Sequence, residues 1–518
     1  MNKQGPDFIS VFNDVLGPIM RGPSSSHTAG SFRIASMARN LLGEIPVEAV
    51  FTFGKGRSCA QVYKEQRVDN ASAVGLMGWN LTDKRFFKAM SYASDKGLNI
   101  VFKKGAVKDK HPNAVHILLK SKNDKKLEIS AKSIGGGAVK ITEINQWSVD
   151  IDGKSYALLI ECQNQEQSSI IDFFRSETDI LIEKKTRKEK SFLCFKKNSD
   201  FNEKITSKLW DNSRVTGIWK CPPVFFTKHG KELFLTAGEI IEQAQRTKRT
   251  LGQLAMDYES KLLGLSFEKI IGEMSNRYQI MKDSVEDGFE NKNIDMKLLH
   301  PSAKSIMEAE SKGCLMGRGI HLRSAGRAMA VMHIANSGGI VCAAPTGGSA
   351  GVLPGVSVTL LKDLNINRDI LIRALFAAGA VGLVIARRAT FAAEEAGCQA
   401  EIGAAGAMAS ALVVEAAGGS TKQALEAAGI SLQNTMGSIC DLVQGRCEIP
   451  CHTRNAAAAS NAFLCADLIM GGYENLISFD ETVEALYSVG KMMPSELRCT
   501  SKGGIAIAPT AKSLSKKK

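Results

Sequence analysis

Three cysteines near the C-terminal end place the strongest constraint on how this chain can fold. Cys398, Cys440 and Cys451 are separated by 42 and by 11 positions. If their thiolates hold three corners of a cubane iron–sulfur cluster, the fold must bring them to one point, and the fourth iron stays open as a Lewis acid. Cysteine is also among the most buried residue types, and no short CxxC pair is present. From spacing alone, a metal site and three buried free cysteines are equally supported.

Length and composition are those of an ordinary globular protein. A chain of 518 residues is long enough for two to four domains and a sizeable core. Its hydrophobic fraction of 44% and charged fraction of 23% are typical of soluble proteins. Twelve cysteines are too few for a disulfide scaffold, and the polar opening Met-Asn-Lys-Gln-Gly-Pro-Asp is not followed by the apolar region of a signal peptide. We therefore expect a cytoplasmic protein with free or metal-bound thiols.

The sequence favours neither a membrane nor a nucleic-acid partner. The Ala/Gly-rich apolar stretch 375–386 is too short to span a bilayer and ends at Arg387 and Arg388. The net charge is +13, but the lysines are dispersed, and no interleaved aromatic residues or nucleic-acid motif accompany them. We expect a solvated basic surface.

The pattern of expected helices and strands divides the chain into three parts. Strand patterns such as 47–53 alternate with a helical pattern over 31–42 in the first part. Residues 155–225 give the order β-α-β-β-α-β, which fits a ferredoxin-like fold. Beyond residue 233 the pattern is mostly helical, with many small residues that allow close packing around a bulky cofactor. The predicted class is α+β multidomain, with an N-terminal α/β domain (1–152), a ferredoxin-like middle module (153–225) and a mostly α-helical cluster domain (233–518).

Long motifs in both halves of the chain resemble the iron–sulfur-dependent L-serine dehydratases. They include Met-Gly-Ser-Ile-Cys-Asp-Leu-Val-Gln-Gly-Arg-Cys-Glu-Ile-Pro-Cys-His-Thr-Arg-Asn around Cys440 and Ala-Gly-Cys-Gln-Ala-Glu-Ile-Gly around Cys398. The segment Gly-Pro-Ser-Ser-Ser-His-Thr-Ala-Gly from residue 22 resembles the family's other signature. Cys-Ala-Ala-Pro-Thr-Gly-Gly-Ser-Ala-Gly-Val from residue 342 and Met-Pro-Ser-Glu-Leu-Arg from residue 493 match the same family.

The resemblance implies an enzyme with beta-type and alpha-type parts fused in one chain. It implies that Cys398, Cys440 and Cys451 hold a 4Fe-4S cluster, whose open iron assists the conversion of L-serine to pyruvate and ammonia. It also implies a small-molecule amino-acid substrate, an ACT-like middle module, a homodimer, and a role in amino-acid degradation and gluconeogenesis. The sequence offers no recognisable pyridoxal phosphate site, so the metal must supply the electrophile.

A dense polar patch runs from Ser24 to Thr28. Spacing alone favours a helix N-cap, which is a common role for serine and threonine. A helix N-terminus with hydroxyls also favours carboxylate binding, so both roles can coexist. With the resemblance, we predict that Ser24, Ser25, Ser26 and Thr28 bind substrate. His27 is a candidate proton carrier because its ordinary pKa suits that role.

Two further segments are candidate parts of the site. His111 lies in His-Pro-Asn-Ala-Val, where a catalytic histidine and a turn residue are equally supported. The loop Pro-Thr-Gly-Gly-Ser-Ala-Gly from residue 345 can cup an anion through backbone N–H groups or form a tight turn between helices. Its family position favours substrate binding by Thr346, Gly348 and Ser349. The remaining cysteines nearby are interpreted as structural or incidental: Cys342, Cys447, Cys465 and Cys499.

Departures from the family pattern leave the substrate open. The family typically has Lys-Gly-His-Gly-Thr-Asp where this chain has Lys-Glu-Gln-Arg-Val-Asp. Gln66 therefore stands at the position of the family histidine, and a glutamine side chain cannot take a proton. The usual Asp-Pro after the second cluster cysteine is Asp441-Leu442. Two alternatives to an L-serine ammonia-lyase follow: a lyase of the same fold acting on another β-hydroxy or β-substituted acid, and a non-catalytic iron–sulfur amino-acid sensor. In some relatives a terminal cysteine occupies the fourth iron. In this chain we do not expect such a terminal ligand unless Cys499 reaches inward.

Overall fold

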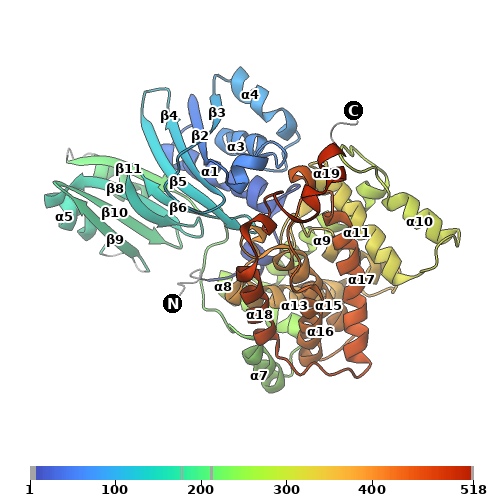
Figure 1. Cartoon of the computed structure of the whole chain (residues 1–518). Coiled ribbons are helices and arrows are strands. Elements are labelled where there is room, and N and C mark those ends of the chain that lie inside the picture. Colours follow the sequence, from blue (N-terminus) through green and yellow to red (C-terminus); the bar gives the residue numbers. More distant parts are fainter. Residues whose placement is uncertain (1–7, 176, 178, 211–213, 515–518) are drawn as a thin grey trace.

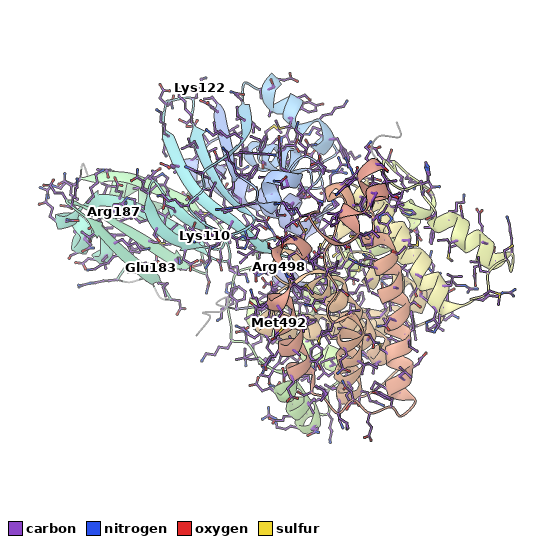
Figure 2. All side chains as sticks on the ribbon, viewed as in Figure 1. Lys110, Lys122, Glu183, Arg187, Met492 and Arg498 are labelled. Atoms are coloured by element: carbon purple, nitrogen blue, oxygen red, sulfur yellow. The ribbon has the colours of Figure 1, made fainter. Side chains whose placement is uncertain are left out.

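The computed structural model describes residues 8–175, 177, 179–210 and 214–514. Within these residues the chain contains both sheets and many helices, which confirms the predicted mixed α+β class. Two sheets lie on one side of a large helical body (Figure 1). Basic side chains such as Lys110, Lys122 and Arg187 are exposed on the outer surface of the sheet-containing part (Figure 2).

A six-stranded sheet forms the centre of the N-terminal part. Its strands lie in the order β3 (Asn99–Gly105), β2 (Glu48–Gly54), β4 (Ala114–Lys120), β5 (Lys126–Gly135), β6 (Ala138–Ile144) and β7 (Trp147–Ile151). Strands β2 and β3 are parallel, and the other neighbours are antiparallel. Along β5, every second residue from Leu127 to Ser133 is buried, as expected for a strand with one face against a core. The helices of this part are α1 (Gly30–Leu42), α2 (Ser58–Val62), α3 (Val68–Met77) and α4 (Ala89–Asp95).

The middle part contains a second, four-stranded antiparallel sheet. In chain order its elements are β8 (Tyr156–Gln163), α5 (Gln167–Asp172), β9 (Leu181–Arg187), β10 (Lys190–Lys197), α6 (Glu203–Trp210) and β11 (Val215–Cys221). The strand order is β11-β8-β10-β9. One face has its own core, which includes Ile160 and Phe195. The other face packs on the N-terminal sheet, where the rings of Trp147 and Phe192 stack with centroids 5.4 Å apart.

The C-terminal part is almost entirely helical. Its long helices are α7 (Ala237–Thr247), α8 (Leu251–Leu263), α9 (Phe267–Phe289), α10 (Ala303–Ser311), α11 (Ile320–Asn336), α12 (Val352–Lys362), α13 (Arg368–Arg388), α15 (Ile402–Ala416), α16 (Thr421–Thr435), α17 (Cys451–Met470) and α18 (Phe479–Met492). Capping boxes begin α8, α16 and α18 and satisfy backbone N–H groups there. Every residue of α15 is buried, so its alanines and glycines allow the surrounding helices to approach closely. The short helices are α14 (Ala393–Ala396) and α19 (Pro509–Ser513).

A short antiparallel pair joins the N-terminal and helical parts. Strand β1 (Ile19–Arg21) pairs with β12 (Ile340–Cys342), with Met20 opposite Val341. The pairing brings the segment after β1 beside the loop after β12. Gly347 is required there, because a Cβ atom would lie 2.7 Å from the carbonyl oxygen of Pro23. Two polar motifs that are more than 300 positions apart in the sequence are therefore in contact.

Helix α13 corrects one prediction from the sequence. The apolar stretch 375–386 was expected to be too short for a membrane span, but the helix around it covers 21 residues, from Arg368 to Arg388. By length and composition it is the one described helix that meets the criteria for a membrane span. In the structure, 78% of its most apolar window is buried inside the protein. Gly382 packs directly against Val15, where a Cβ atom would come within 2.1 Å of a methyl carbon.

Candidate active site

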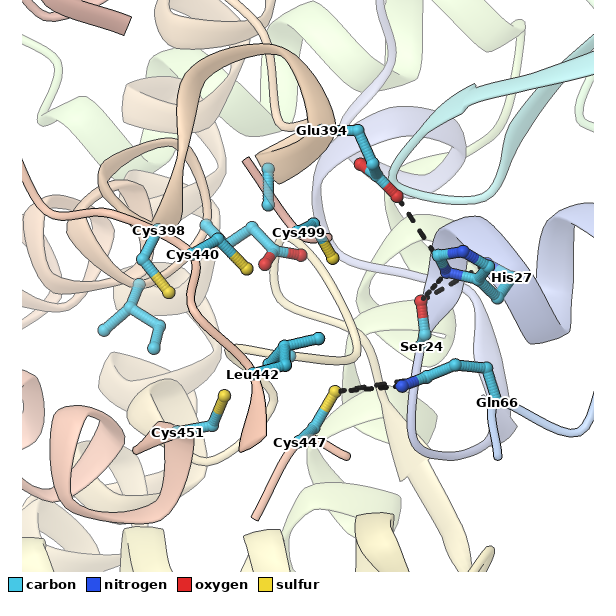
Figure 3. A pocket seen from close by; sticks show the side chains of 14 residues that line it. Ser24, His27, Gln66, Glu394, Cys398, Cys440, Leu442, Cys447, Cys451 and Cys499 are labelled. Atoms are coloured by element: carbon cyan, nitrogen blue, oxygen red, sulfur yellow. Dashed lines mark hydrogen bonds and ion pairs between the residues drawn. The ribbon is translucent and has the colours of Figure 1, made fainter. Parts of the chain in front are cut away.

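A buried cavity between the N-terminal and helical parts brings the three predicted ligand cysteines together. Cys398, Cys440 and Cys451 all line this cavity. Cys447 and Cys499, which the sequence suggested to be structural or incidental, line the same cavity (Figure 3). All five side chains are buried, and all twelve cysteines of the chain are free of disulfides. The other walls include Ser24, His27, Gln66, Glu394, Glu401 and Leu442.

The three predicted ligands reach the cavity from different elements. Cys398 follows α14 and starts the turn that leads into α15. Cys440 follows α16, and its backbone pairs with the segment at Arg498. Cys451 is the first residue of α17. Thiolates at or near helix N-termini are stabilised by the backbone N–H groups and the helix dipole, which favours metal binding at Cys451.

The five thiols form two contacting groups. Cys440 hydrogen-bonds to both Cys398 and Cys499, and Cys451 hydrogen-bonds to Cys447. The contact with Cys440, together with burial, raises the pKa of Cys398 well above its ordinary value. The contact with Cys447 and burial do the same for the pKa of Cys451. Without a metal these thiols are therefore neutral, and a metal that binds them must displace their protons.

Arg454 supplies positive charge beside the thiols. Its guanidinium lies 3.0 Å from Asp441 and donates to the backbone oxygen of Ile439 at 2.7 Å. Burial opposes the charged form, but Cys398 and Asp441 raise the pKa of Arg454 above its ordinary value. A permanent cation at this position compensates for negative charge that thiolates bring into a buried site.

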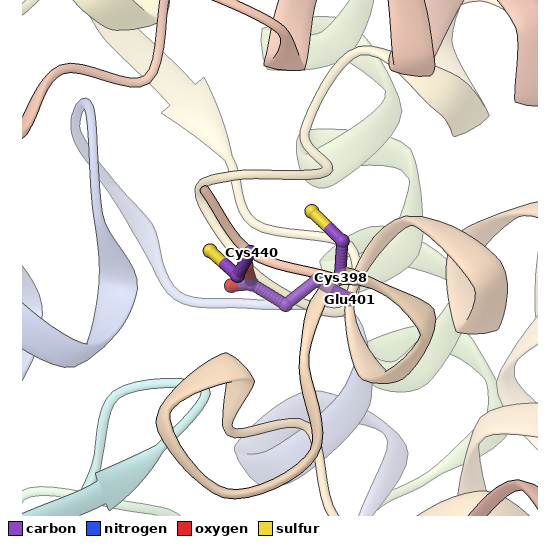
Figure 4. A group of neighbouring side chains, drawn as sticks. All are labelled: Cys398, Glu401 and Cys440. Carbon is purple, nitrogen blue, oxygen red and sulfur yellow. The ribbon is translucent and has the colours of Figure 1, made fainter. Parts of the chain in front are cut away.

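Glu401 lies beside two of the thiols (Figure 4). Its carboxylate oxygen and the sulfurs of Cys398 and Cys440 all lie within 4.8 Å of one another. Burial, followed by the charges of Cys398 and Glu394, raises the pKa of Glu401 well above its ordinary value. The raised pKa favours the protonated carboxyl of Glu401, which lies next to the predicted metal ligands.

The predicted Ser-His segment faces the cysteines across the cavity. Residues Ser25–Ala29 form a short π-helical turn before α1, and Ser24 caps it by accepting from the N–H of His27. The Ser24 Oγ also lies 3.1 Å from His27 Nδ1, whereas Ser58 Oγ lies 3.4 Å from His27 Nε2. The cap predicted from spacing is thus present, and Ser24 and His27 line the cavity as well.

His27 has an acidic neighbour that sequence reasoning missed. Glu394 Oε1 lies 3.9 Å from His27 Nδ1 and accepts a hydrogen bond from Asn113 Nδ2 at 3.1 Å. Burial lowers the pKa of His27, and Glu394 partly offsets that effect. His27 is therefore neutral near pH 7 and able to accept a proton. The Glu394-Glu395 pair interrupts an Ala-rich stretch, which is a signal that could have identified it from the sequence.

Most of the other predicted substrate-binding residues do not line the cavity but contact residues around it. Ser25 Oγ accepts from the N–H of Gly347 at 3.2 Å, and Thr28 Oγ1 donates to the backbone oxygen of Gln66 at 2.9 Å. Ser26 is buried in the same turn. In the loop after β12, Gly348 lines the cavity, whereas Thr346 and Ser349 hydrogen-bond to each other at 3.1 Å.

His111 does not line the cavity but contacts residues beside it. Its Nε2 is 3.9 Å from Glu395 Oε1, and its Nδ1 accepts from the N–H of Asn113 at 3.2 Å. Burial lowers the pKa of His111, and Glu394 partly offsets that effect. The Asn113 side chain that bonds to Glu394 thus connects the two predicted catalytic histidines.

Gln66 lines the cavity beside Cys447. Its Nε2 donates to the Gly445 oxygen at 2.6 Å and lies 3.7 Å from the sulfur of Cys447. The side chain is almost fully buried. Gln66, at the position of the family histidine, is therefore buried and contacts a thiol instead of being exposed to solvent.

Comparisons with known proteins identify relatives of the helical part. A family described as "Serine dehydratase alpha chain" matches residues 228–506. The "Probable L-serine dehydratase, alpha chain" of Bacillus subtilis is 36% identical over 285 residues, which cover 55% of this chain and 95% of that protein. The "L-serine dehydratase, alpha chain" of Peptoniphilus asaccharolyticus is 34% identical over 280 residues, covering 54% and 96%. The "L-serine dehydratase 1" of Escherichia coli is 37% identical over 182 residues, covering 35% and 40%.

Proposed function

This chain belongs to the iron–sulfur-dependent L-serine dehydratase family, and we propose that it is an L-serine ammonia-lyase that produces pyruvate and ammonia. The observation that supports this function best is one buried cavity in which cysteines face His27 and two glutamates. Dehydration of serine needs an electrophile for the hydroxyl group and a base for the α-hydrogen. The cavity offers residues for both tasks.

We propose Cys398, Cys440 and Cys451 as the ligands of a 4Fe-4S cluster. The donor set fits such a group, because these thiols are soft ligands, buried, free of disulfides and close to Arg454. When bound, the cluster supplies an iron that acts as a Lewis acid on the substrate hydroxyl. Arg454 and the N-terminus of α17 compensate for the charge of the thiolates.

His27 is the proposed base. Its Nδ1 is the nitrogen toward the cavity, because its neighbours Ser24 and Glu394 both line that cavity. The neutral imidazole accepts the α-proton at Nδ1, and Glu394 then stabilises the imidazolium. Glu401, held protonated by burial, is the proposed donor of a proton to the departing hydroxyl group.

The substrate carboxylate is proposed to bind between the Ser24 turn and the loop after β12. Ser24 and Gly348 contribute directly to the cavity wall. Ser25 and Thr346 hold the loops in place through Gly347 and Glu401. Hydroxyl and backbone N–H donors at a turn that precedes a helix are suited to a carboxylate. Ser26, Thr28 and Ser349 complete the predicted substrate-binding set.

Replacing Glu394 with glutamine tests the pairing with His27. Because Glu394 raises the pKa of His27, its removal should lower that pKa further below 6.5, the ordinary value for histidine. The neutral base then persists to lower pH, so the acid limb of the kcat/KM profile should move to lower pH. The plateau rate should also fall, because the imidazolium loses its counter-charge. Glu395→Gln is the matched control, and an acid limb that Glu394→Gln leaves in place would contradict the pairing.

The function is tested by anaerobic reconstitution with iron and sulfide, followed by an assay for keto acids. L-serine should give pyruvate, and the activity should fall in air and return with iron and reductant. A parallel screen of other β-hydroxy and β-substituted acids tests the alternative substrates that Gln66 suggests. If one of these acids has a higher kcat/KM than L-serine, that acid is the substrate. If none of the compounds gives a keto acid, an amino-acid sensor is favoured. Full activity of an air-exposed, metal-free sample would contradict the cluster.

The finer architecture is part of the same proposal. We propose a beta-type α/β domain over 1–152, an ACT-like ferredoxin-like module over 153–225 and an alpha-type catalytic domain over 233–518. The strand order β11-β8-β10-β9 supports the second assignment, and the family match over 228–506 supports the third. A cytoplasmic homodimer without membrane or nucleic-acid partners stays a prediction.

A further inference from the structure

One leucine side chain lies among the polar walls of the cavity. Leu442 belongs to the segment between Cys440 and Cys451, and it is one of the residues that line the cavity. Figure 3 shows its side chain between the thiols and the residues Ser24 and Gln66. Only 4% of Leu442 is exposed. A buried leucine has no polar group to offer to a reaction, so its contribution to the site is its shape.

The backbone of Leu442 is held in place. Its carbonyl oxygen accepts a hydrogen bond from Ser501 Oγ at 2.6 Å, and the N–H of the next residue, Val443, donates to the Ile449 oxygen at 3.1 Å. The φ angle of Leu442 is −54°, within the range that proline requires. The backbone therefore does not require leucine where the family usually has proline, and what the replacement changes is the side chain that faces the cavity.

The proposed binding mode leaves the β-carbon of the substrate for Leu442 to contact. The carboxylate is assigned to Ser24 and Gly348, the α-hydrogen to His27, and the hydroxyl group to the thiol side of the cavity. The β-carbon carries that hydroxyl group, so it lies between the thiols and the Ser24 turn, as the Leu442 side chain does (Figure 3). Its two hydrogens are apolar and suit an aliphatic wall.

We propose that Leu442 is a specificity-determining residue, whose side chain contacts the β-carbon of the substrate and excludes amino acids that carry an additional carbon there. This inference rests on the function proposed above. The class of substrate that fits is a β-hydroxy amino acid with an unsubstituted β-carbon. L-threonine and L-allo-threonine, which add one methyl group to that carbon in either configuration, are excluded. Because the backbone is fixed and the side chain is buried, the leucine does not move away to admit the methyl group.

A second aliphatic residue of the cavity provides the matched control. Ile402 also lines the cavity and is 5% exposed. It is the first residue of α15 and follows Glu401, so it reaches the cavity from a different element than Leu442. Ile402→Ala removes as many carbon atoms as Leu442→Ala. It therefore shows whether any enlargement of the cavity relaxes the specificity, or only an enlargement at Leu442.

The specificity is measured on wild type, Leu442→Ala, Leu442→Val and Ile402→Ala after anaerobic reconstitution with iron and sulfide. The kcat/KM for L-serine, L-threonine and L-allo-threonine is obtained from keto-acid formation. The midpoint of thermal unfolding, Tm, is measured with an excess of each amino acid, because a ligand that binds the folded protein raises Tm whether or not it reacts. Val443→Ala is a second control, since Val443 is buried in the same loop but is not among the lining residues.

The expected result is a change of specificity in the Leu442 variants alone. Leu442→Ala should raise kcat/KM for at least one of the two threonine diastereomers, relative to L-serine, by about 10-fold or more, the scale of discrimination that one methyl group gives in an apolar pocket. The same diastereomer should raise the Tm of Leu442→Ala but not that of wild type. Leu442→Val should give a smaller rise, and it is the second test if the alanine variant fails to fold.

Three results would overturn the role of Leu442. They are ratios in both Leu442 variants equal to those of wild type, a rise in Ile402→Ala as large as in Leu442→Ala, or a wild type that uses either threonine diastereomer as well as L-serine. A wild type that L-serine stabilises but that forms no pyruvate would overturn the proposed function instead. The Tm values would then still test Leu442, so the two failures are distinguishable.

Discussion

Serine in place of Cys398, Cys440 or Cys451 is expected to abolish bound iron and sulfide and, with them, pyruvate formation. Each thiol reaches the same cavity from a different element: the turn before α15, the loop after α16 and the first residue of α17. A serine hydroxyl is a harder, less acidic ligand than a thiol, so it does not substitute for thiolate on iron.

The control for this result lies in the same helix as Cys451. Cys465 is a fully buried cysteine of α17 that contacts Asn434 rather than the cavity, and Cys465→Ser should keep its iron. Cys447→Ser should also retain a cluster, because three proposed ligands remain. Iron and sulfide analysis with the visible absorption spectrum measures the effect. A colourless Cys447→Ser protein together with a brown Cys451→Ser protein would show that the ligands are assigned wrongly.

Local sequence patterns predicted the elements of the fold better than their contacts. Alternation identified β2 near 47–53, where the structure has Glu48–Gly54, and the helical pattern over 31–42 corresponds to α1 at Gly30–Leu42. Both signals arise within a few residues, from the period of a strand or a helix. The apolar stretch 375–386 lies within the longer helix α13, which continues through charged residues at both ends.

The contacts within the candidate site depend on pairings that no local pattern contains. Glu394 lies near His27 although 367 positions separate them, because β1 pairs with β12 and brings the two parts of the chain together. Cys499 reaches the cavity because its segment pairs with the backbone at Cys440. The motifs predicted which thiols would meet, since the family resemblance carries long-range information. The acidic partners and the two additional thiols needed the three-dimensional arrangement.

Replacing His27 with alanine is expected to reduce turnover by about 100-fold or more, the usual scale for loss of a general base. Its imidazole lines the cavity, is kept neutral by burial and has Glu394 beside Nδ1 to stabilise the protonated form. Gln66 cannot replace it, because an amide does not accept a proton at neutral pH. Since His27 is not a proposed ligand, the variant should keep the iron and sulfide of wild type, and the loss should appear in kcat.

The other histidines decide whether this loss is specific. The Nε2 of His116 lies 3.0 Å from Glu128 Oε1 on the sheet, and His116 is not among the residues that line the cavity, so His116→Ala should leave kcat close to wild type. His111→Ala should have an intermediate effect, because His111 acts on the cavity through Asn113 and Glu394 rather than by lining it. Anaerobic kcat and KM, measured beside iron content, separate these cases. If His27→Ala retains wild-type turnover while His111→Ala loses it, the base is His111, and His27 has a structural role through its contacts with Ser24, Ser58 and Glu394.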